Sequence, residues 1–311
     1  MHKSILILSN KSSGSSAVQR LLSQAADLKC IEKTRHFQNE SLYWTKAASA
    51  LGLPQVNMLD SEVPIPPAQA KTDLIALLRD NVSNCQLPVP SQPLEPTFIF
   101  EGWRRLCEQY QPIFLEKSPH HLLQSSALSL IVSCMEQLEG QVEFLLIGLV
   151  RNPMDVLYSA FRRWRTPPEK LQYEWLTAYE NLRDLAMTVG DRNPTSPFNP
   201  NPNGRLVTIR YEDLANSLSP LAPVFDFCKT GPSVTAQPLN RHSLLKWQQD
   251  SFFGFTLAPE VIDLAQAYGY HTTELFNTPS PLWPPYRSSL RSIHQSTRWA
   301  KAAYLQWNPP Q

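Results

Sequence analysis

Hydrophobic residues gather in four short runs that predict strands. The clearest run is Val142–Val150, which is apolar at nearly every position; the others are Ser4–Leu8, Ile113–Leu115 and Arg205–Arg210. Runs of this length that are apolar at successive positions indicate strands buried on both faces.

A helical pattern of apolar positions follows each strand. These helices are predicted from Ser15 to about Ala26, and over Pro119–Gln137, Pro153–Trp164 and Tyr211–Leu218. Repeated strand-then-helix units predict an α/β fold: a three-layer α/β/α sandwich with a mainly parallel central sheet, similar in architecture to P-loop NTPases. Such sheets bind ligands at the carboxyl ends of their strands.

Proline-rich stretches interrupt this pattern. We predict one domain over residues 1–270, with proline-rich insertions at about 54–97 and 191–204, because each proline fixes φ and removes a backbone donor. Residues 271–311 are predicted to form a C-terminal extension that packs on the domain. The sequence shows no internal repeat.

Composition narrows the class of protein. Of the 311 residues 42% are hydrophobic and 18% charged, and the formal net charge is +1. These values fit a globular protein whose overall charge is too small to attract nucleic acid. Any anion-binding site must therefore be built from a few neighbouring residues. Five scattered cysteines predict neither a zinc site nor a disulfide framework. The first apolar run is too short for a signal peptide or membrane span, and we expect a cytoplasmic protein.

The first strand runs into a loop rich in serine, Ser9–Ser16, before the next helix starts. Its candidate anion-binding residues are Lys11, Ser12, Ser13, Gly14, Ser15 and Ser16. Backbone N–H groups and the dipole at a helix N-terminus attract phosphate or sulfate. The loop lacks the Gly-Lys-Ser/Thr sequence of a Walker A motif. An ordinary capped turn remains the alternative interpretation.

A second anion-binding pattern follows the longest strand. Arg151 comes directly after it, Pro153 suits the first turn of the next helix, and Ser159 lies two turns into that helix. An arginine fork can bind phosphate bidentately. A capped helix with a surface arginine is the alternative. The basic, aromatic end of this helix, residues 161–165, is another candidate contact.

The segment Arg151-Asn152-Pro153-Met154-Asp155-Val156-Leu157-Tyr158-Ser159 resembles the 3′-phosphate-binding segment of sulfotransferases. Further segments resemble that family in the same order: the Ser9–Ser16 loop, Phe114–His120, Arg210–Leu214, Lys246-Trp247, Leu257–Glu260 and Gly269-Tyr270. Together they cover roughly residues 3 to 270.

The resemblance implies a donor and a reaction. The co-substrate would be 3′-phosphoadenosine 5′-phosphosulfate (PAPS), with Arg151 and Ser159 on its 3′-phosphate and the Ser9–Ser16 loop on its 5′-phosphosulfate. Its sulfuryl group would pass to a hydroxyl or amine of a small-molecule, carbohydrate or lipid acceptor, and no metal is required. We predict no nucleic-acid partner, and the oligomeric state stays open.

One position departs from the family pattern. The family usually carries Lys or Arg two residues before the loop glycine, where this chain has Ser12. Three interpretations follow: Lys11 substitutes for the usual basic residue, another residue such as Lys117 stabilises the leaving group, or the activity is weak.

Several side chains are candidates for the base that accepts the acceptor's proton. Glu116, within Glu-Lys-Ser-Pro, is favoured narrowly. The resemblance to carbohydrate sulfotransferases also favours Glu32, His36 or Glu40 as the base. His120 and His121, at the start of the next predicted helix, are two more candidates. Two other functions stay open: a non-catalytic nucleotide-binding protein of the same fold, and a P-loop kinase.

Overall fold

The computed structural model describes residues 1–25, 27–36, 38–83, 94–229, 237–250 and 253–277, with a few isolated positions beyond residue 284. Its centre is a five-stranded sheet in the order β2-β3-β1-β4-β5, in which every neighbouring pair is parallel. The prediction of an α/β fold with a mainly parallel sheet is therefore confirmed.

The elements follow one another in a strand-and-helix alternation. The strands are β1 (His2–Ser9), β2 (Leu28–Cys30), β3 (Ile113–Lys117), β4 (Val142–Val150) and β5 (Leu206–Arg210). The longer helices are α1 (Ser15–Ala25), α2 (Tyr43–Ala50), α3 (Pro67–Asn81), α4 (Pro96–Gln109), α6 (Ser125–Gln137), α7 (Pro153–Trp164), α8 (Pro168–Val189), α10 (Ala222–Cys228) and α12 (Pro259–Ala267). Short helices are α5 (His120–Leu123), α9 (Tyr211–Leu214), α11 (Lys246–Gln249) and the 3₁₀ turns Ser219–Leu221, Arg241–Ser243 and Thr272–Glu274. None of the described helices is long and apolar enough to cross a membrane.

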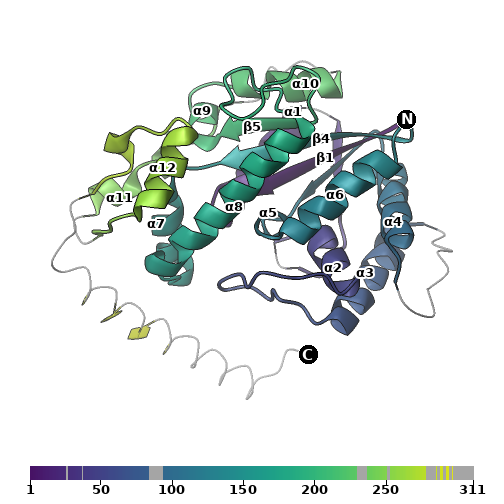
Figure 1. Ribbon diagram of the computed structural model, residues 1–311, viewed down its shortest axis with the longest axis horizontal. Coiled ribbons are helices and arrows are strands. Elements are labelled where there is room, and N and C mark those ends of the chain that lie inside the picture. The colour runs from purple at the N-terminus through teal and green to yellow at the C-terminus, as the bar shows by residue number, and fades with distance from the viewer. Residues whose placement is uncertain are drawn as a thin grey trace.

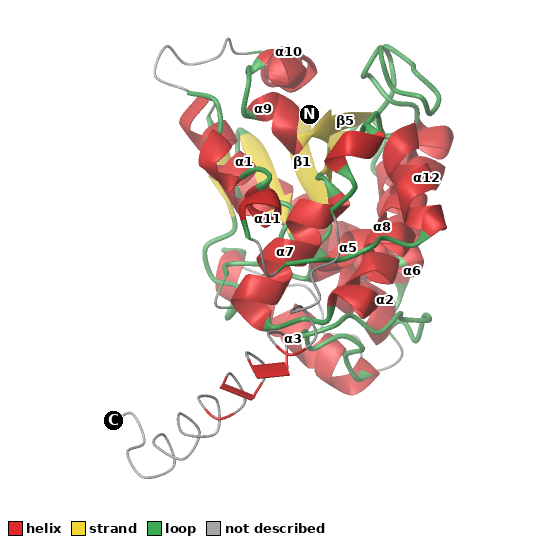
Figure 2. Cartoon of the chain, turned by 90° about the vertical axis from the view of Figure 1, so that its left-hand side faces the viewer, coloured by secondary structure: helices red, strands yellow, loops and turns green. Residues whose placement is uncertain are grey.

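The two faces of the sheet are covered by different helices (Figure 1 and Figure 2). Along β1, Ile5 and Ile7 pack with α1, α9 and α10 on one face, whereas Leu6 and Leu8 pack with the larger group that includes α2, α6 and α8 on the other. Side chains alternate across a strand, so every second residue enters each core. The result is the predicted three-layer sandwich.

The topology fixes where a ligand can bind. From β1 the chain moves past β3 to β2, while from β4 it moves the other way to β5. These opposite directions make a switch point between the carboxyl ends of β1 and β4, which is where α/β sheets hold their ligands. Both sequence-predicted anion-binding loops, after Ser9 and after Val150, leave the sheet at this point.

Two predicted helices are shorter than the sequence suggests. The pattern over Pro119–Gln137 is divided into α5 and α6 at Gln124, whose backbone is extended. Its side-chain amide both accepts a hydrogen bond from the Val56 N–H and donates one to the Val56 carbonyl, at 2.7 Å each. The helix predicted over Tyr211–Leu218 stops at Leu214.

The proline-rich stretches contain more regular structure than we expected. Helix α3 lies within the first predicted insertion and buries Ala70, Leu74, Leu77 and Leu78. The second stretch lies along the free edge of β5, where the Arg192 N–H donates to the Leu206 carbonyl. Most of the predicted extension over 271–311 lies outside the described residues.

Candidate functional site

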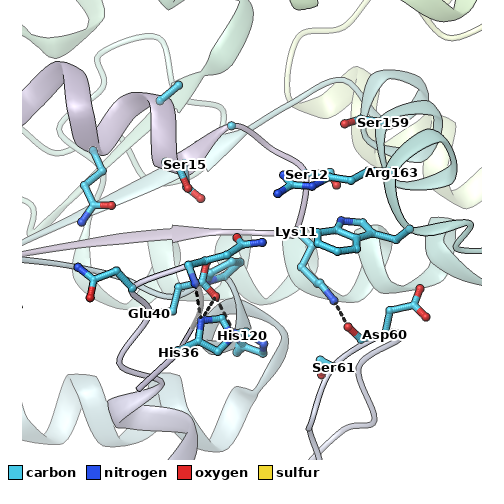
Figure 3. A pocket seen from close by; sticks show the side chains of 18 of the residues that line it. Lys11, Ser12, Ser15, His36, Glu40, Asp60, Ser61, His120, Ser159 and Arg163 are labelled. Atoms are coloured by element: carbon cyan, nitrogen blue, oxygen red, sulfur yellow. Dashed lines mark hydrogen bonds and ion pairs between the residues drawn. The ribbon is translucent and has the colours of Figure 1, made fainter. Parts of the chain in front are cut away.

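A cleft of about 1150 Å³ is lined by residues from both predicted anion-binding loops (Figure 3). Its lining residues come from the segment after β1 and the start of α1, the segments 36–40 and 60–62, the residues after β3, and the end of β4 with α7. Among the described residues, no group of three histidine, cysteine or acidic side chains is placed to hold a metal ion.

The loop between β1 and α1 presents a helix N-terminus to the cleft. Ser12 and Gly14 adopt positive φ angles of 63° and 89°, and the chain then enters α1 at Ser15. Gly14 packs so closely against Tyr211 that a Cβ there would lie 2.3 Å from the ring. Only glycine combines this conformation with this contact. The loop can therefore offer its backbone and the dipole of α1 to an anion.

Ser13 has another role in the same loop. Its side chain is buried and hydrogen-bonded to the Tyr179 hydroxyl at 3.0 Å, and that hydroxyl in turn donates to the Leu149 carbonyl. Ser13 thus fastens the loop to β4 and α8, and it is not part of the cleft lining, whereas Ser12, Ser15 and Ser16 are.

Arg151 joins the two anion-binding segments. Its Nη1 donates to the Ser12 carbonyl at 3.0 Å, and its guanidinium lies 4.7 Å from the centre of the Tyr211 ring. Its own carbonyl accepts a hydrogen bond from the Trp175 indole at 3.0 Å. Arg151 and Ser159 both line the cleft. The arginine is thus held in place by protein contacts at the edge of the cleft.

The start of α7 is built as the sequence predicts. Pro153 is the first helical residue, and the Asn152 side chain accepts a hydrogen bond from the Met154 N–H at 2.9 Å. Asp155 is in the first turn but is buried, and burial raises the pKa of its carboxyl to about 7. The capped helix presents Ser159 and Arg163 to the cleft.

A cluster of ionisable side chains centres on Glu40, which is buried. Its Oε1 accepts from the Lys117 ammonium at 2.6 Å, while its Oε2 lies 3.7 Å from Nδ1 of His36 and 3.6 Å from Nδ1 of His120. The far nitrogens of the two imidazoles lie 3.8 and 3.7 Å from the carboxylate oxygens of Glu62. The two histidines and two glutamates of this cluster line the cleft.

The protonation of His120 follows from its surroundings. Burial, together with the nearby His121 and Lys11, lowers the pKa of His120 well below its ordinary 6.5. The imidazole is therefore neutral at neutral pH and has a free lone pair on one nitrogen. A neutral imidazole beside a carboxylate is suited to accepting a proton.

Lys11 supplies a cation to the cleft. Its ammonium donates to the carbonyls of Leu59 and Asp60, at 3.0 and 2.5 Å. Burial lowers the pKa of Lys11, opposed by the neighbouring Asp60 and Glu174 carboxylates. The side chain thus reaches the cleft from the position before Ser12, and it also holds the segment around residue 60.

Glu116 lies away from the cleft. It is 1% exposed, accepts hydrogen bonds from the Ser41 and Ser118 hydroxyls at 2.5 Å each, and lies 3.4 Å from Nε2 of His121. Burial would raise the pKa of Glu116, but His121 and the two hydroxyls outweigh it, so the pKa is lowered. The carboxylate therefore fastens β3 to the segment before α2.

The structure thus brings together most of the predicted residues. Those lining the cleft are Lys11, Ser12, Gly14, Ser15, Ser16, His36, Glu40, His120, Arg151 and Ser159; those outside the lining are Ser13, Glu32, Glu116, Lys117 and His121. The sequence analysis missed Glu62 and Arg20. Glu62 lies in a proline-rich segment interpreted as an insertion, and Arg20 carries no motif.

A switch-point cleft that combines a helix N-terminus, a fixed arginine and a cluster of ionisable side chains is the kind of site in which α/β proteins bind anionic ligands. The family model described as "Sulfotransferase family" matches residues 4–229. The chain belongs to the sulfotransferase family.

One solved structure supports the similarity of fold. The "Sulfotransferase Domain from the Curacin Biosynthetic Pathway" aligns with a TM-score of 0.53 at 18% identity, covering 87% of this chain and 99% of that one. The "Sulfotransferase Domain from the Synechococcus PCC 7002 Olefin Synthase" aligns with a TM-score of 0.49 at 19% identity, covering 86% and 95%. A search of curated proteins gave no match.

Proposed function

We propose that the protein transfers a sulfuryl group from PAPS to a hydroxyl or amine of a small-molecule, carbohydrate or lipid acceptor. The observation that carries this proposal is one cleft lined both by an anion-binding helix N-terminus with Arg151 and by the acid–base cluster around Glu40. Family membership supports the same reaction class.

The donor would lie across the switch point. Its 5′-phosphosulfate would accept hydrogen bonds from the loop at Ser12–Ser16, and its 3′-phosphate would contact Arg151 and Ser159. Because Arg151 is already held against Ser12 and Tyr211, little side-chain entropy is lost when it binds an anion.

The acid–base step is assigned to the Glu40 cluster. His120 is neutral and lines the cleft, so it can take the proton of the acceptor hydroxyl while the Glu40 carboxylate, 3.6 Å away, stabilises the resulting imidazolium. His36 occupies the equivalent position on the other side of Glu40, at 3.7 Å. Lys117 pairs with Glu40 at 2.6 Å and holds its carboxylate in place.

Charge on the leaving phosphate oxygen needs a cation. Lys11 is the lysine in the cleft lining, and we assign it this role. To act there, its ammonium would exchange the carbonyls of Leu59 and Asp60 for the donor's oxygens. Lys117, the alternative from the sequence, is buried behind Glu40 and has a structural partner.

The test is calorimetric titration with 3′-phosphoadenosine 5′-phosphate (PAP) and with ATP. We expect wild type to bind PAP selectively, and Ser159→Ala and Arg151→Lys to weaken it, because each removes a hydrogen bond to the 3′-phosphate. Arg183→Lys is the matched control, since Arg183 lies on α8 and pairs with its neighbour Asp184.

A second measurement separates the competing functions. Transfer of radiolabelled sulfate from PAPS to a mixed panel of hydroxyl and amine acceptors would show turnover. Selective PAP binding without turnover on any acceptor would favour the non-catalytic nucleotide-binding protein. ATP bound more tightly than PAP with magnesium present would refute the proposal and favour a kinase.

A further inference from the structure

A second cavity of about 350 Å³ adjoins the acid–base side of the cleft. His36 and Glu62 line both spaces. The second cavity therefore begins at the cluster proposed to activate the acceptor, and its lining includes no residue of the Arg151–Ser159 segment. An acceptor whose hydroxyl lies against His36 and His120 can extend into it.

The chemistry of this cavity is set by Lys46, which lies on α2. Its side chain is 9% exposed and lines the cavity. No residue that the structure describes forms a hydrogen bond or an ion pair with its ammonium. Burial lowers the pKa of Lys46, opposed by the Asp73 and Glu62 carboxylates. A buried cation without a partner is costly, and a bound anion would remove that cost.

The acidic side chains of the same cavity have other contacts. Asp73 accepts a hydrogen bond from Gln69 at 2.6 Å, and Glu62 lies beside the two imidazoles. By contrast, Lys46 borders the open volume of the cavity, together with Ile65 and Leu77, and has no hydrogen bond or ion pair to a described residue. The cavity thus combines a small apolar patch with polar side chains, among which Lys33 and Arg35 are exposed cations and Lys46 is the buried one. This lining suits an amphipathic ligand with an anionic end.

We propose that this cavity is the acceptor subsite and that Lys46 binds an anionic group of the acceptor, a carboxylate or another oxyanion. The acceptor class is then a hydroxylated acid, with an apolar portion between the accepting hydroxyl and the anion. This inference rests on the proposed function, because it places the accepting hydroxyl at the Glu40 cluster.

The test compares matched acceptors that differ only at one end. Three series of increasing chain length serve as probes: linear ω-hydroxy carboxylates, ω-hydroxyalkyl phosphates and the corresponding diols. Binding is measured by ligand-observed NMR with and without PAP. We expect one anionic series to bind wild type at least about tenfold more tightly than the diols, since hydrogen bonds to charged groups are the strong ones. The anionic series that binds more tightly identifies the oxyanion, a carboxylate or a phosphate, that the cavity prefers.

Variants assign the effect to Lys46. Lys46→Met should abolish the preference for the anion, Lys46→Arg should keep most of it, and Lys29→Met, at an exposed lysine on β2, should leave it unchanged. Circular dichroism confirms that each variant is folded. If Lys46→Met fails to fold, Lys46→Arg still tests the proposal, because a variant that keeps the positive charge should keep most of the preference for the anion.

The possible failures are distinguishable. Equal binding of acids and diols, no binding of any probe, or a preference that survives Lys46→Met in a folded protein would overturn the subsite while PAP binding stands. Binding of acids through Lys46 with no binding of PAP would refute the proposed donor and leave the subsite supported.

Discussion

Gly14 is the position where one methyl group should damage both stability and donor binding. Its φ is +89°, and a Cβ would lie 2.3 and 2.7 Å from two carbons of the Tyr211 ring. The ring is itself packed on Arg151, 4.7 Å from its guanidinium. Gly14→Ala therefore forces either the loop or the ring away, and each carries part of the candidate donor site.

The expected cost has two parts. A left-handed backbone costs an alanine about 1–2 kcal/mol, and overpacking a filled site costs about 1–3 kcal/mol. The sum predicts a loss of about 2–5 kcal/mol in the free energy of unfolding, measured by chemical denaturation. Gly52→Ala is the matched control, because Gly52 has φ +74° and nothing within 4 Å of its Cβ position. Gly52→Ala should lose only about 1–2 kcal/mol, which is the cost of the left-handed backbone.

A double-mutant cycle isolates the contact. Combining Gly14→Ala with Tyr211→Ala should recover the overpacking part, because the ring that meets the new methyl group is gone. PAP affinity should fall at least about tenfold in Gly14→Ala and stay unchanged in Gly52→Ala. If Gly14→Ala were no more destabilising than Gly52→Ala, the packing of this loop against Tyr211 would be disproved.

Three further variants test the assigned roles. Lys11→Met should lower kcat about 10²–10³-fold and also weaken PAP binding, because PAP carries the 5′-phosphate charge that Lys11 would neutralise, and adding Ser12→Lys should restore part of kcat. An unchanged kcat would remove Lys11 from the mechanism. His120→Gln should lower kcat about 10²–10⁴-fold. Because the folded pKa of His120 is below 6.5, wild type should lose stability as pH falls through 6.5 and the variant should lose less. Burial raises the pKa of Glu174 to about 7 from 4.5. The folded state then holds a proton that the unfolded state lacks, so relative to Glu174→Gln wild type should lose up to about 3 kcal/mol as pH rises from 4.5 to 7, seen in denaturation curves.

Much of the sheet was predictable because its strands are buried on both faces. The bounds of Val142–Val150 and of the helix over Pro153–Trp164 agree with the structure. Strand β2 was missed because Leu28–Cys30 is too short to show a pattern. Helices α2 and α8 were missed because their buried faces include polar residues such as Thr45 and Gln172, which weaken the hydrophobic periodicity.

The anion-binding side of the site was predictable for a topological reason. Both of its loops follow strands directly, and strands of a parallel sheet end at one edge, so Lys11 and Arg151 had to meet there. The acceptor side of the site was harder to predict, because its residues are brought together by contacts between segments far apart in the sequence. Glu62 and Lys46 join the site through the packing of segments whose sequence carries no motif.

The neighbours Glu116 and Lys117 show what decides between two candidate bases. Side chains at successive positions of a strand point to opposite faces, so only one of this pair can face the Glu40 cluster. Lys117 does so and pairs with Glu40 at 2.6 Å, while Glu116 turns to Ser41, Ser118 and His121. The end of β3 thus serves two purposes. One side chain fixes the scaffold, and the other pairs with Glu40 and holds its carboxylate 3.6 Å from His120, where it would stabilise an imidazolium.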